Sequence, residues 1–323
     1  MEYRQFAQTG VNLSRIGFGC GPASGYDYGP VDELEWRLSV QAALENGINF
    51  FDVADVYGFG RAEEMLSQAL GPRRHEVVVA TKFGLAWDQD GKVRRDLSRQ
   101  SVLRSVEGSL RRLRLDVIPL CQIHWPDQST PMEETFEALA QCQRQGKIRY
   151  VGVSNFSSDL LQQAYAICHF QSEQVAFNLL CREPEREIFP WCKSAGVSIL
   201  AHSGLARGLL AGGYAAGQSN RFSDTRRNSP YFSEDGRAEK QHLLDAIRKI
   251  TTEENRPFSS VAIRWILDSA YVSTVLIGIK SRAQLMQNLQ AIGWHLGVSK
   301  RRLLGELSSQ CPAGLAGVPA HKQ

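Results

Sequence analysis

Short apolar runs alternate along the chain with longer segments whose apolar residues recur every three to four positions. The first pattern predicts β-strands and the second predicts amphipathic α-helices. Strands are expected at residues 16–19, 49–52, 76–82, 116–124, 148–155, 172–178, 197–202 and 272–278. Helices are expected after them, at residues 32–46, 62–70, 98–113, 131–145, 157–167, 187–195, 238–254, 259–268 and 281–291.

The expected strands are apolar almost throughout, which is typical of parallel strands that are covered on both faces. Eight such strands, each followed by helix, predict a closed (β/α)8 barrel. An open doubly wound sheet is the alternative, and it normally carries GxGxxG after its first strand. Here the motif is incomplete, because its last position would be Pro22 when counted from Gly17, or Ser24 when counted from Gly19. The pattern therefore favours the barrel.

Three segments fall outside the repeating units. Residues 1–14 predict a β-hairpin that closes one end of the core, and residues 294–323 predict one more helix and a tail. Residues 203–237 lack a clear periodicity and hold six glycines together with Arg207, Arg221, Arg226 and Arg227. A loop of this length is usually functional. We expect one domain over residues 1–323, with the barrel at about 15–293.

Composition narrows the class of protein. The 37 basic and 34 acidic residues are interspersed and leave a net charge of +3, so no nucleic-acid partner is expected. The seven cysteines show neither CxxC nor zinc spacing, which predicts free thiols in a cytoplasmic protein and no metal site. The N-terminus is not a signal peptide and no apolar run reaches 18 residues, so no membrane partner is expected. The oligomeric state stays open.

Reactive side chains stand at the ends of three consecutive strands. Asp52 ends the second strand, Lys82 the third and His124 the fourth, and Tyr57 follows Asp52 in the next loop. Each alone has a simpler interpretation, such as a helix cap, a surface lysine, a core histidine or a packed ring. In a barrel, however, the carboxyl ends of the strands meet at one face. Their coincidence therefore indicates a site.

These four groups are complementary. A tyrosine has an ordinary pKa of about 10, and the ammonium of Lys82 is expected to lower it. Asp52 is expected to hold Lys82, and His124 to donate a hydrogen bond to a bound carbonyl oxygen. Tyr57 would then act as the general acid. This chemistry predicts carbonyl reduction, with hydride from an organic cofactor.

Six motifs occur in a characteristic order: FFDVADVYG, ATKFG, QIHWPD, GVSNFS, SGLARGLLAGG and IGIKSRAQLMQNL. With them, the chain resembles the aldo-keto reductase superfamily from about residue 3 to residue 295. The resemblance implies a (β/α)8 barrel and a nicotinamide cofactor, usually NADPH, that is bound in an extended form. It also implies that Asp52, Tyr57, Lys82 and His124 form the catalytic tetrad.

The resemblance further implies a set of cofactor contacts. The contacts with the nicotinamide would be Asp52, Ser154, Asn155, Gln174 and His202. The contacts with the pyrophosphate would be Ser203, Gly204, Leu205 and Arg207. The contacts with the adenosine phosphate would be Gly278, Lys280, Gln284, Gln287 and Asn288. Independently, Gly278 permits a close approach of backbone to a ligand, and Ser281 is expected to cap a helix whose first N–H groups favour an anion. Lys280 and Arg282 add positive charge, which favours NADP over NAD.

One segment departs from the family pattern. Relatives commonly read Tyr-Ser-Pro-Leu after the seventh strand, whereas this chain reads His202-Ser203-Gly204-Leu205. An imidazole covers less of a nicotinamide ring than a phenol does, and it can take up a proton near neutral pH. Gly204 in place of proline is expected to loosen the loop. We therefore expect cofactor binding that is weaker or more sensitive to pH than in a typical relative.

The expected substrate pocket combines Tyr57 and His124 with Trp87 and Trp125, and Tyr26 and Tyr28 are expected at its rim. Aromatic walls suit sugar rings or flat apolar ligands, although packing in a lid or core is the alternative. The main functional hypothesis is an NADP-dependent reductase of aldehydes or ketones, or the reverse dehydrogenase. A redox-sensing subunit like the potassium-channel β subunits is one alternative, although the start of the hairpin near Met1 favours a free-standing enzyme. A reductase of sugar nucleotides in natural-product biosynthesis is another.

Overall fold

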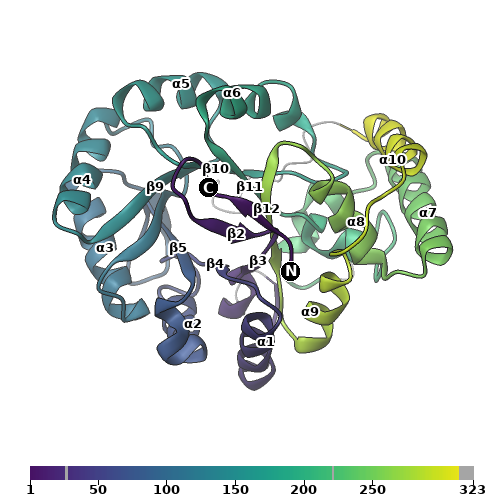
Figure 1. The fold of residues 1–323 in the computed structure, drawn as a ribbon, viewed down its shortest axis with the longest axis horizontal. Coiled ribbons are helices and arrows are strands. Elements are labelled where there is room, and N and C mark those ends of the chain that lie inside the picture. Colours follow the sequence, from purple (N-terminus) through teal and green to yellow (C-terminus); the bar gives the residue numbers. More distant parts are fainter. Residues whose placement is uncertain (26–27, 220–221, 313–323) are drawn as a thin grey trace.

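The computed structural model of the chain describes residues 1–25, 28–219 and 222–312. Its parallel strands close into a barrel, with each strand hydrogen-bonded to the next and the last to the first (Figure 1). In barrel order these strands are β3 (Ile16–Gly19), β4 (Phe50–Asp52), β5 (Val78–Phe83), β8 (Ile118–Ile123), β9 (Ile148–Ser154), β10 (Ser172–Ala176), β11 (Ser198–His202) and β12 (Val272–Gly278). The predicted (β/α)8 barrel is confirmed.

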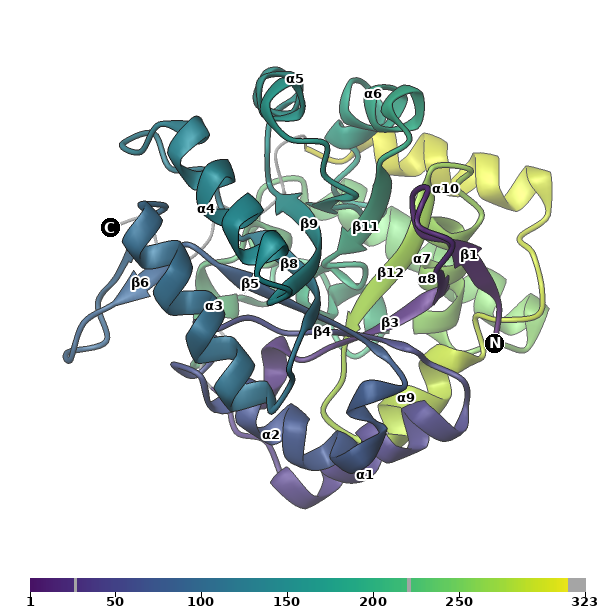
Figure 2. The same ribbon diagram turned by 60° about the vertical axis from the view of Figure 1, so that its left-hand side comes forward.

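Helices surround the barrel, as Figures 1 and 2 show. They are α1 (Glu33–Glu45), α2 (Arg61–Leu70), α3 (Arg99–Leu113), α4 (Met132–Arg144), α5 (Ser158–Ile167), α6 (Ile188–Ala195), α7 (Arg237–Glu254), α8 (Phe258–Leu267), α9 (Arg282–Leu289) and α10 (Val298–Gln310). The expected cap at Ser281 is present, because its side chain accepts a hydrogen bond from the N–H of Gln284. Asp32 caps α1 in the same way, by accepting from the N–H groups of Leu34 and Glu35. Within the described ranges, no helix has the length and apolar character that a membrane span needs.

The N-terminal hairpin closes one end of the barrel. It pairs β1 (Tyr3–Gln5) with β2 (Asn12–Ser14), and its ribbon crosses the barrel opening in Figure 1. Phe6 and Leu13 are fully buried there, in one apolar cluster with Phe50, Leu120 and Leu200 from the barrel strands. Because the hairpin fills this end, the barrel is open to a ligand at the other end, where the strands finish.

Two kinds of local structure were not predicted. A hairpin pairs β6 (Leu85–Trp87) with β7 (Val93–Arg95), and its turn is held by the carboxylate of Asp88, which accepts from the N–H groups of Asp90 and Lys92. Short 3-10 helices occur at η1 (Gly21–Ser24), η2 (Gly71–His75), η3 (Glu183–Glu185), η4 (Ala206–Ala211), η6 (Thr225–Asn228) and η7 (Pro230–Phe232). The expectations for Tyr26, Arg221 and residues 313–323 lie outside the described residues.

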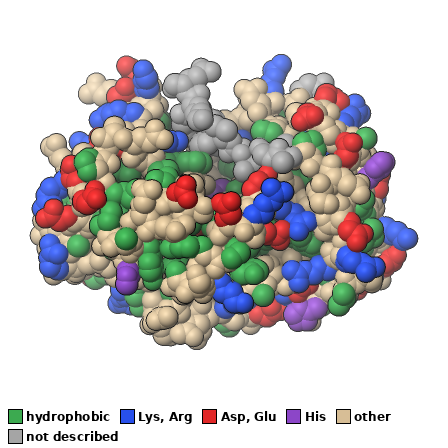
Figure 3. All heavy atoms as spheres, turned by 90° about the horizontal axis from the view of Figure 1, so that it is seen from above, with side chains coloured by type: hydrophobic (Ala, Val, Ile, Leu, Met, Phe, Trp, Pro, Cys, Tyr) green, Lys and Arg blue, Asp and Glu red, His purple; other side chains and the backbone are tan. Residues whose placement is uncertain are grey.

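The face of the molecule seen in Figure 3 carries charge of both signs. On the face seen in Figure 3, Lys and Arg side chains lie among Asp and Glu side chains, with apolar groups between them. This mixture agrees with the nearly equal totals of 37 basic and 34 acidic residues in the chain.

Candidate active site

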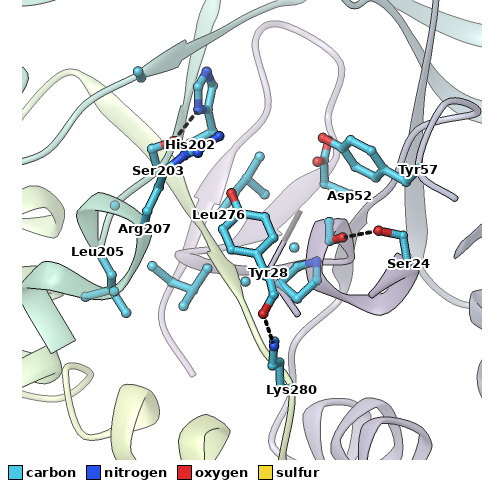
Figure 4. Close-up of a pocket in the computed structure, with 18 of the residues that line it drawn as sticks. Ser24, Tyr28, Asp52, Tyr57, His202, Ser203, Leu205, Arg207, Leu276 and Lys280 are labelled. Carbon is cyan, nitrogen blue, oxygen red and sulfur yellow. Dashed lines mark hydrogen bonds between the residues drawn. The ribbon is translucent and has the colours of Figure 1, made fainter. Parts of the chain in front are cut away.

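A cavity of about 740 Å³ opens at the carboxyl ends of the barrel strands. Figure 4 shows side chains pointing into it from opposite sides, with Tyr57 and Asp52 facing His202 and Arg207. Every cofactor contact that the sequence implied lines this one cavity: Asp52, Ser154, Asn155, Gln174, His202, Ser203, Gly204, Leu205, Arg207, Gly278, Lys280, Gln284, Gln287 and Asn288. The topology thus brings together residues from almost the whole length of the chain.

The four expected catalytic groups meet at one part of the cavity. The ammonium Nζ of Lys82 lies 2.6 Å from a carboxylate oxygen of Asp52 and donates to the backbone oxygen of Val53 at 3.0 Å. It also lies 3.4 Å from the phenol oxygen of Tyr57. The rings of Tyr57 and His124 are 5.7 Å apart between centroids and nearly perpendicular. An ion pair, a phenol and an imidazole therefore converge, as the sequence predicted.

The protonation of this group differs in one respect from the expectation. Burial alone would lower the pKa of Lys82, but the Asp52 carboxylate and Tyr57 outweigh it and raise that pKa, so the lysine stays charged. Burial raises the pKa of Tyr57 to about 12, against the opposing effect of Lys82. The expected lowering is thus wrong for the protein alone, because burial penalises the phenolate and Asp52 offsets the lysine charge. Tyr57 consequently holds its proton at neutral pH.

Asp52 is fixed by amides as well as by Lys82. Its second oxygen accepts a hydrogen bond from the side chain of Gln174 at 2.7 Å and one from that of Gln122 at 3.3 Å. Gln122 is fully buried, and its own oxygen accepts from Ser172. The sequence analysis missed Gln122, although a signal exists: a polar residue two positions before His124 in an apolar strand faces the same side as His124. Gln174, expected at the carboxamide, lies against Asp52 here.

A second network joins the loops after β9 and β11. The Asn155 amide donates to the backbone oxygen of His124 at 3.1 Å and to the hydroxyl of Ser154 at 2.9 Å. Its oxygen lies 3.1 Å from Nε2 of His202, and Nδ1 of His202 lies 2.9 Å from the Ser203 hydroxyl (Figure 4). Because the Asn155 oxygen only accepts, Nε2 of His202 carries the proton and Nδ1 accepts from Ser203. This arrangement fits a neutral imidazole.

The expectation that His202 charges near neutral pH is wrong. Burial, followed by the positive charges of Lys82 and Arg207, lowers the pKa of His202 to about 3. The imidazole therefore stays neutral at physiological pH, and it has no means of making cofactor binding sensitive to pH in that range.

We predict a stability effect of His202 at acidic pH instead. Because its pKa is lowered from 6.5 to about 3 on folding, only the unfolded chain takes up a proton between these values. Stability is unaffected above about pH 6.5 and falls as pH drops towards 3. Thermal unfolding at pH 7 and pH 4.5 should show a larger loss for the wild type than for His202→Tyr. Equal losses of stability in the two proteins would refute the neutral state assigned to His202. It would also be refuted if NADPH affinity varied with pH between 6 and 8 in the wild type and varied less in His202→Tyr.

The far end of the cavity carries positive charge. The guanidinium of Arg207 lies over the Tyr28 ring at 5.7 Å, within a turn where Ser203, Ala206 and Arg207 all have positive φ. The ammonium of Lys280 donates to the backbone oxygens of Tyr28, Gly29 and Pro30. Gln284 lies one turn further and accepts from the N–H of Lys280 at 2.9 Å. Lys280 thus ties the cofactor segment to the loop after β3, while Arg282 is exposed and is not among the described lining residues.

The expected substrate residues are only partly in contact with the cavity. Tyr57, His124 and Trp125 line it, and Tyr28 lies within it, whereas Trp87 is not among the described lining residues. The Trp87 ring packs instead against Phe59, at 5.8 Å between centroids, and Phe59 does line the cavity. Trp87 therefore supports the wall from behind rather than forming it.

The comparisons with known proteins agree with this geometry. The model of the family described as "Aldo/keto reductase family" matches residues 15–298. "Aldo-keto reductase YhdN" of Bacillus subtilis is 34% identical over 92% of this chain and 90% of its own length. "Probable voltage-gated potassium channel subunit beta" of Oryza sativa is 32% identical over 90% of this chain and 91% of its own. "NADH-specific methylglyoxal reductase" of Escherichia coli is 28% identical over 93% and 96%.

Solved structures are similar over the same extent. The glycerol dehydrogenase AKR11B4 from Gluconobacter oxydans superimposes with a TM-score of 0.87 at 31% identity, covering 98% of each chain. Its barrel therefore matches this one from end to end.

Proposed function

Because the chain belongs to the aldo/keto reductase family of oxidoreductases, we propose that it reduces an aldehyde or ketone to an alcohol with NADPH, or catalyses the reverse reaction. One observation carries the proposal: the charged Lys82 lies between Asp52, at 2.6 Å, and the protonated phenol of Tyr57, at 3.4 Å, and both of these partners line the cavity. A proton donor beside a fixed cation is what the reduction of a carbonyl needs.

The cavity suits an extended dinucleotide. Amide and hydroxyl groups of Ser154 and Asn155 lie beside the tetrad, since the Asn155 amide donates to the backbone oxygen of His124. The cations Arg207 and Lys280 both contact Tyr28. Gly21 leaves room beside the phenol, because a Cβ there would meet the Tyr57 ring no closer than 3.9 Å. We propose that these groups hold the nicotinamide amide and the phosphates respectively. The bound cofactor supplies the hydride.

The protein's own residues handle the proton. Tyr57 donates it to the carbonyl oxygen as negative charge develops there, and His124 stabilises that oxygen with a hydrogen bond. The Lys82 ammonium stabilises the phenolate that Tyr57 becomes, and Asp52 keeps the ammonium in place. Gln122 and Gln174 hold Asp52 in turn, so that the charge does not move as the proton leaves.

The test of this function is NADPH oxidation across classes of carbonyl compound. The wild type should consume NADPH with at least one aldehyde or ketone, and absorbance at the reduced nicotinamide band would follow it. Tyr57→Phe serves as the blank. If no carbonyl is reduced while NADPH still binds tightly, the proposed function is wrong. In that case the relative named as a potassium-channel subunit, with 32% identity, favours a nicotinamide-binding regulatory subunit.

We also propose NADP rather than NAD as the cofactor. Lys280 and Arg226 support this choice, since both reach the backbone of Tyr28 at the phosphate end of the cavity. Arg226 is already paired with Asp224, whereas the ammonium of Lys280 donates to backbone oxygens. We predict that Lys280→Met weakens NADPH binding about 10-fold and NADH binding less than about twofold, as expected for the loss of one ion pair. Fluorescence titration measures both, with the exposed Lys249→Met as the control.

An unchanged ratio of the NADPH and NADH dissociation constants in Lys280→Met would remove the support for NADP.

We further propose that the whole chain acts as one domain, and that it resides in the cytoplasm, where seven free thiols such as those observed are maintained.

A further inference from the structure

The backbone at Phe59 adopts a conformation that side chains normally avoid. Its φ is +55°, between Gly58 at +58° and Gly60 at +96°. The left-handed region is costly for a residue with a Cβ and is adopted freely only by glycine. Such a residue persists where surrounding structure holds it, and it clusters at functional sites. The neighbouring glycines permit the turn, so the phenyl group itself calls for an explanation.

The ring of Phe59 is exposed rather than packed in the core. Its side chain is 40% accessible, and it lines the cavity two residues after Tyr57. The Trp87 ring supports it at 5.8 Å, and the tip of the β6–β7 hairpin approaches it so closely that a Cβ at Gly91 would lie 3.3 Å from the ring. The hairpin thus holds Phe59 over the cavity from outside.

The neighbours of this ring are apolar. Val56, Leu85, Val93 and Trp125 line the same part of the cavity, and all four lie in one cluster that also contacts the Tyr57 ring. Together with Phe59 they make a wall of aliphatic and aromatic surface around the reacting phenol.

Within the described part of the chain, charge beside Tyr57 is confined to the buried ion pair of Asp52 and Lys82, and the other charged lining groups lie elsewhere in the cavity. Among the described lining residues the cations are Arg207, Arg226 and Lys280, and all three contact Tyr28. In Figure 4, Arg207 and Tyr57 face the cavity from opposite sides, with Tyr28 between Arg207 and Lys280. The exposed Arg95 lies over the Trp125 ring, 5.4 Å from its centroid, but it is not among the described lining residues. A carboxylate or phosphate on a substrate at Tyr57 would therefore lose water without a lining cation as its partner, which is costly.

We infer that Phe59 is a specificity-determining residue, and that the site takes uncharged carbonyl compounds bearing an aryl or other extended apolar group. This inference rests on the proposed reduction, in which hydride adds to the carbonyl carbon, a proton from Tyr57 adds to the oxygen, and NADPH becomes NADP⁺. The aryl group would lie against Phe59 and Trp125, since aromatic rings prefer tilted or edge contacts of this kind. Small polyhydroxylated and anionic carbonyl compounds would be poor substrates.

The experiment compares kcat/KM for benzaldehyde, glyceraldehyde and 4-carboxybenzaldehyde in the wild type, Phe59→Ala, Phe59→Leu and Tyr271→Ala. Tyr271 is the matched control, because it is 37% exposed and directly precedes the start of β12, at the opposite end of the barrel. In the wild type, kcat/KM for benzaldehyde should exceed that for each of the other two aldehydes at least about 10-fold. Phe59→Ala should lower the benzaldehyde-to-glyceraldehyde ratio about 10-fold, Phe59→Leu should lower it less, and Tyr271→Ala should leave it unchanged.

Stability separates this role from a structural one. The thermal midpoint of Phe59→Gly should equal or exceed that of the wild type, because glycine relieves the left-handed backbone, while the substrate preference is lost. An unchanged ratio in Phe59→Ala, or a wild-type preference for the carboxylate-bearing aldehyde, would overturn the inference.

A binding measurement covers the case in which no carbonyl is reduced. Benzyl alcohol is titrated into the protein loaded with NADP⁺, and tryptophan fluorescence is followed. Absence of turnover would then count against the proposed function alone. Weaker binding of benzyl alcohol to Phe59→Ala, by about 10-fold, would support the inference, and equal binding would overturn it.

Discussion

Replacing Tyr57 with phenylalanine should lower kcat for carbonyl reduction by a factor of about 10²–10⁴, the usual contribution of a general acid. The variant loses the only protonated hydroxyl that lies beside Lys82, at 3.4 Å, among the described residues of the tetrad. The ring contact with His124 is kept, because phenylalanine retains the aromatic edge. Steady-state kinetics with a substrate of the wild type would measure the loss.

The binding of NADPH is the control for this variant. Its dissociation constant should change by less than about twofold, since the proposed phosphate contacts of Arg207 and Lys280 are untouched and an exchange of tyrosine for phenylalanine removes one oxygen. A Tyr57→Phe enzyme with full activity would show that another group donates the proton. A variant that loses NADPH binding together with activity would leave Tyr57 without a specific catalytic role.

Replacing Lys82 with methionine should both abolish activity and lower the free energy of unfolding by about 3–5 kcal/mol, the usual cost of breaking a buried ion pair. Lys82 is 1% exposed and Asp52 is 4% exposed, so the remaining carboxylate would be buried and, among the described residues, would keep Gln122 and Gln174 as its side-chain donors. The proton transfer would fail as well, because the phenolate of Tyr57 would lose its cation. Urea denaturation and steady-state kinetics report the two effects.

A double variant separates the two roles of the pair. Lys82→Met with Asp52→Leu removes both charges, and a well-packed apolar pair is often as stable as a buried ion pair. The double variant should therefore regain most of the lost stability and none of the activity. Wild-type stability in Lys82→Met alone would show that the ion pair does not bear on folding, and activity in either variant would contradict its role in catalysis.

The sequence was sufficient for the barrel and for the meeting of the tetrad. Continuous apolar strands between helices predict parallel pairing, and the carboxyl ends of such strands meet at one face. Asp52, Lys82 and His124 could therefore be brought together from their positions at strand ends alone. Tyr57 could be assigned to the same site because its loop directly follows Asp52.

Protonation could not be predicted in the same way. The pKa of Tyr57 rises to about 12 and that of His202 falls to about 3, in both cases chiefly because of burial. Burial depends on loops that are distant in sequence, such as those after β3 and β11, and on how closely they cover the site. The ordinary pKa of a side chain, corrected for one neighbouring charge, does not predict the size of either shift. For Tyr57 it does not predict the direction of the shift either.

Supporting residues were missed for a related reason. Gln122 acts on Asp52 across strands that are not neighbours in sequence, and its role depends on the register of the barrel. Phe59 stands in a loop between two glycines, and no periodicity in the sequence marks a left-handed turn there. The β6–β7 hairpin, which supports Phe59 through Trp87, consists of strands of three residues each, too short to show an alternating pattern.

The most direct test of the proposed reaction is to follow the hydride. The enzyme is incubated with a carbonyl substrate and NADPH that carries deuterium at the transferred position of the nicotinamide, and the alcohol is analysed by mass spectrometry and NMR. The proposed reaction predicts one deuterium on the carbinol carbon of the product, formed together with one NADP⁺. An alcohol without deuterium on that carbon, or NADPH that stays bound and unoxidised with every carbonyl compound tried, would contradict it.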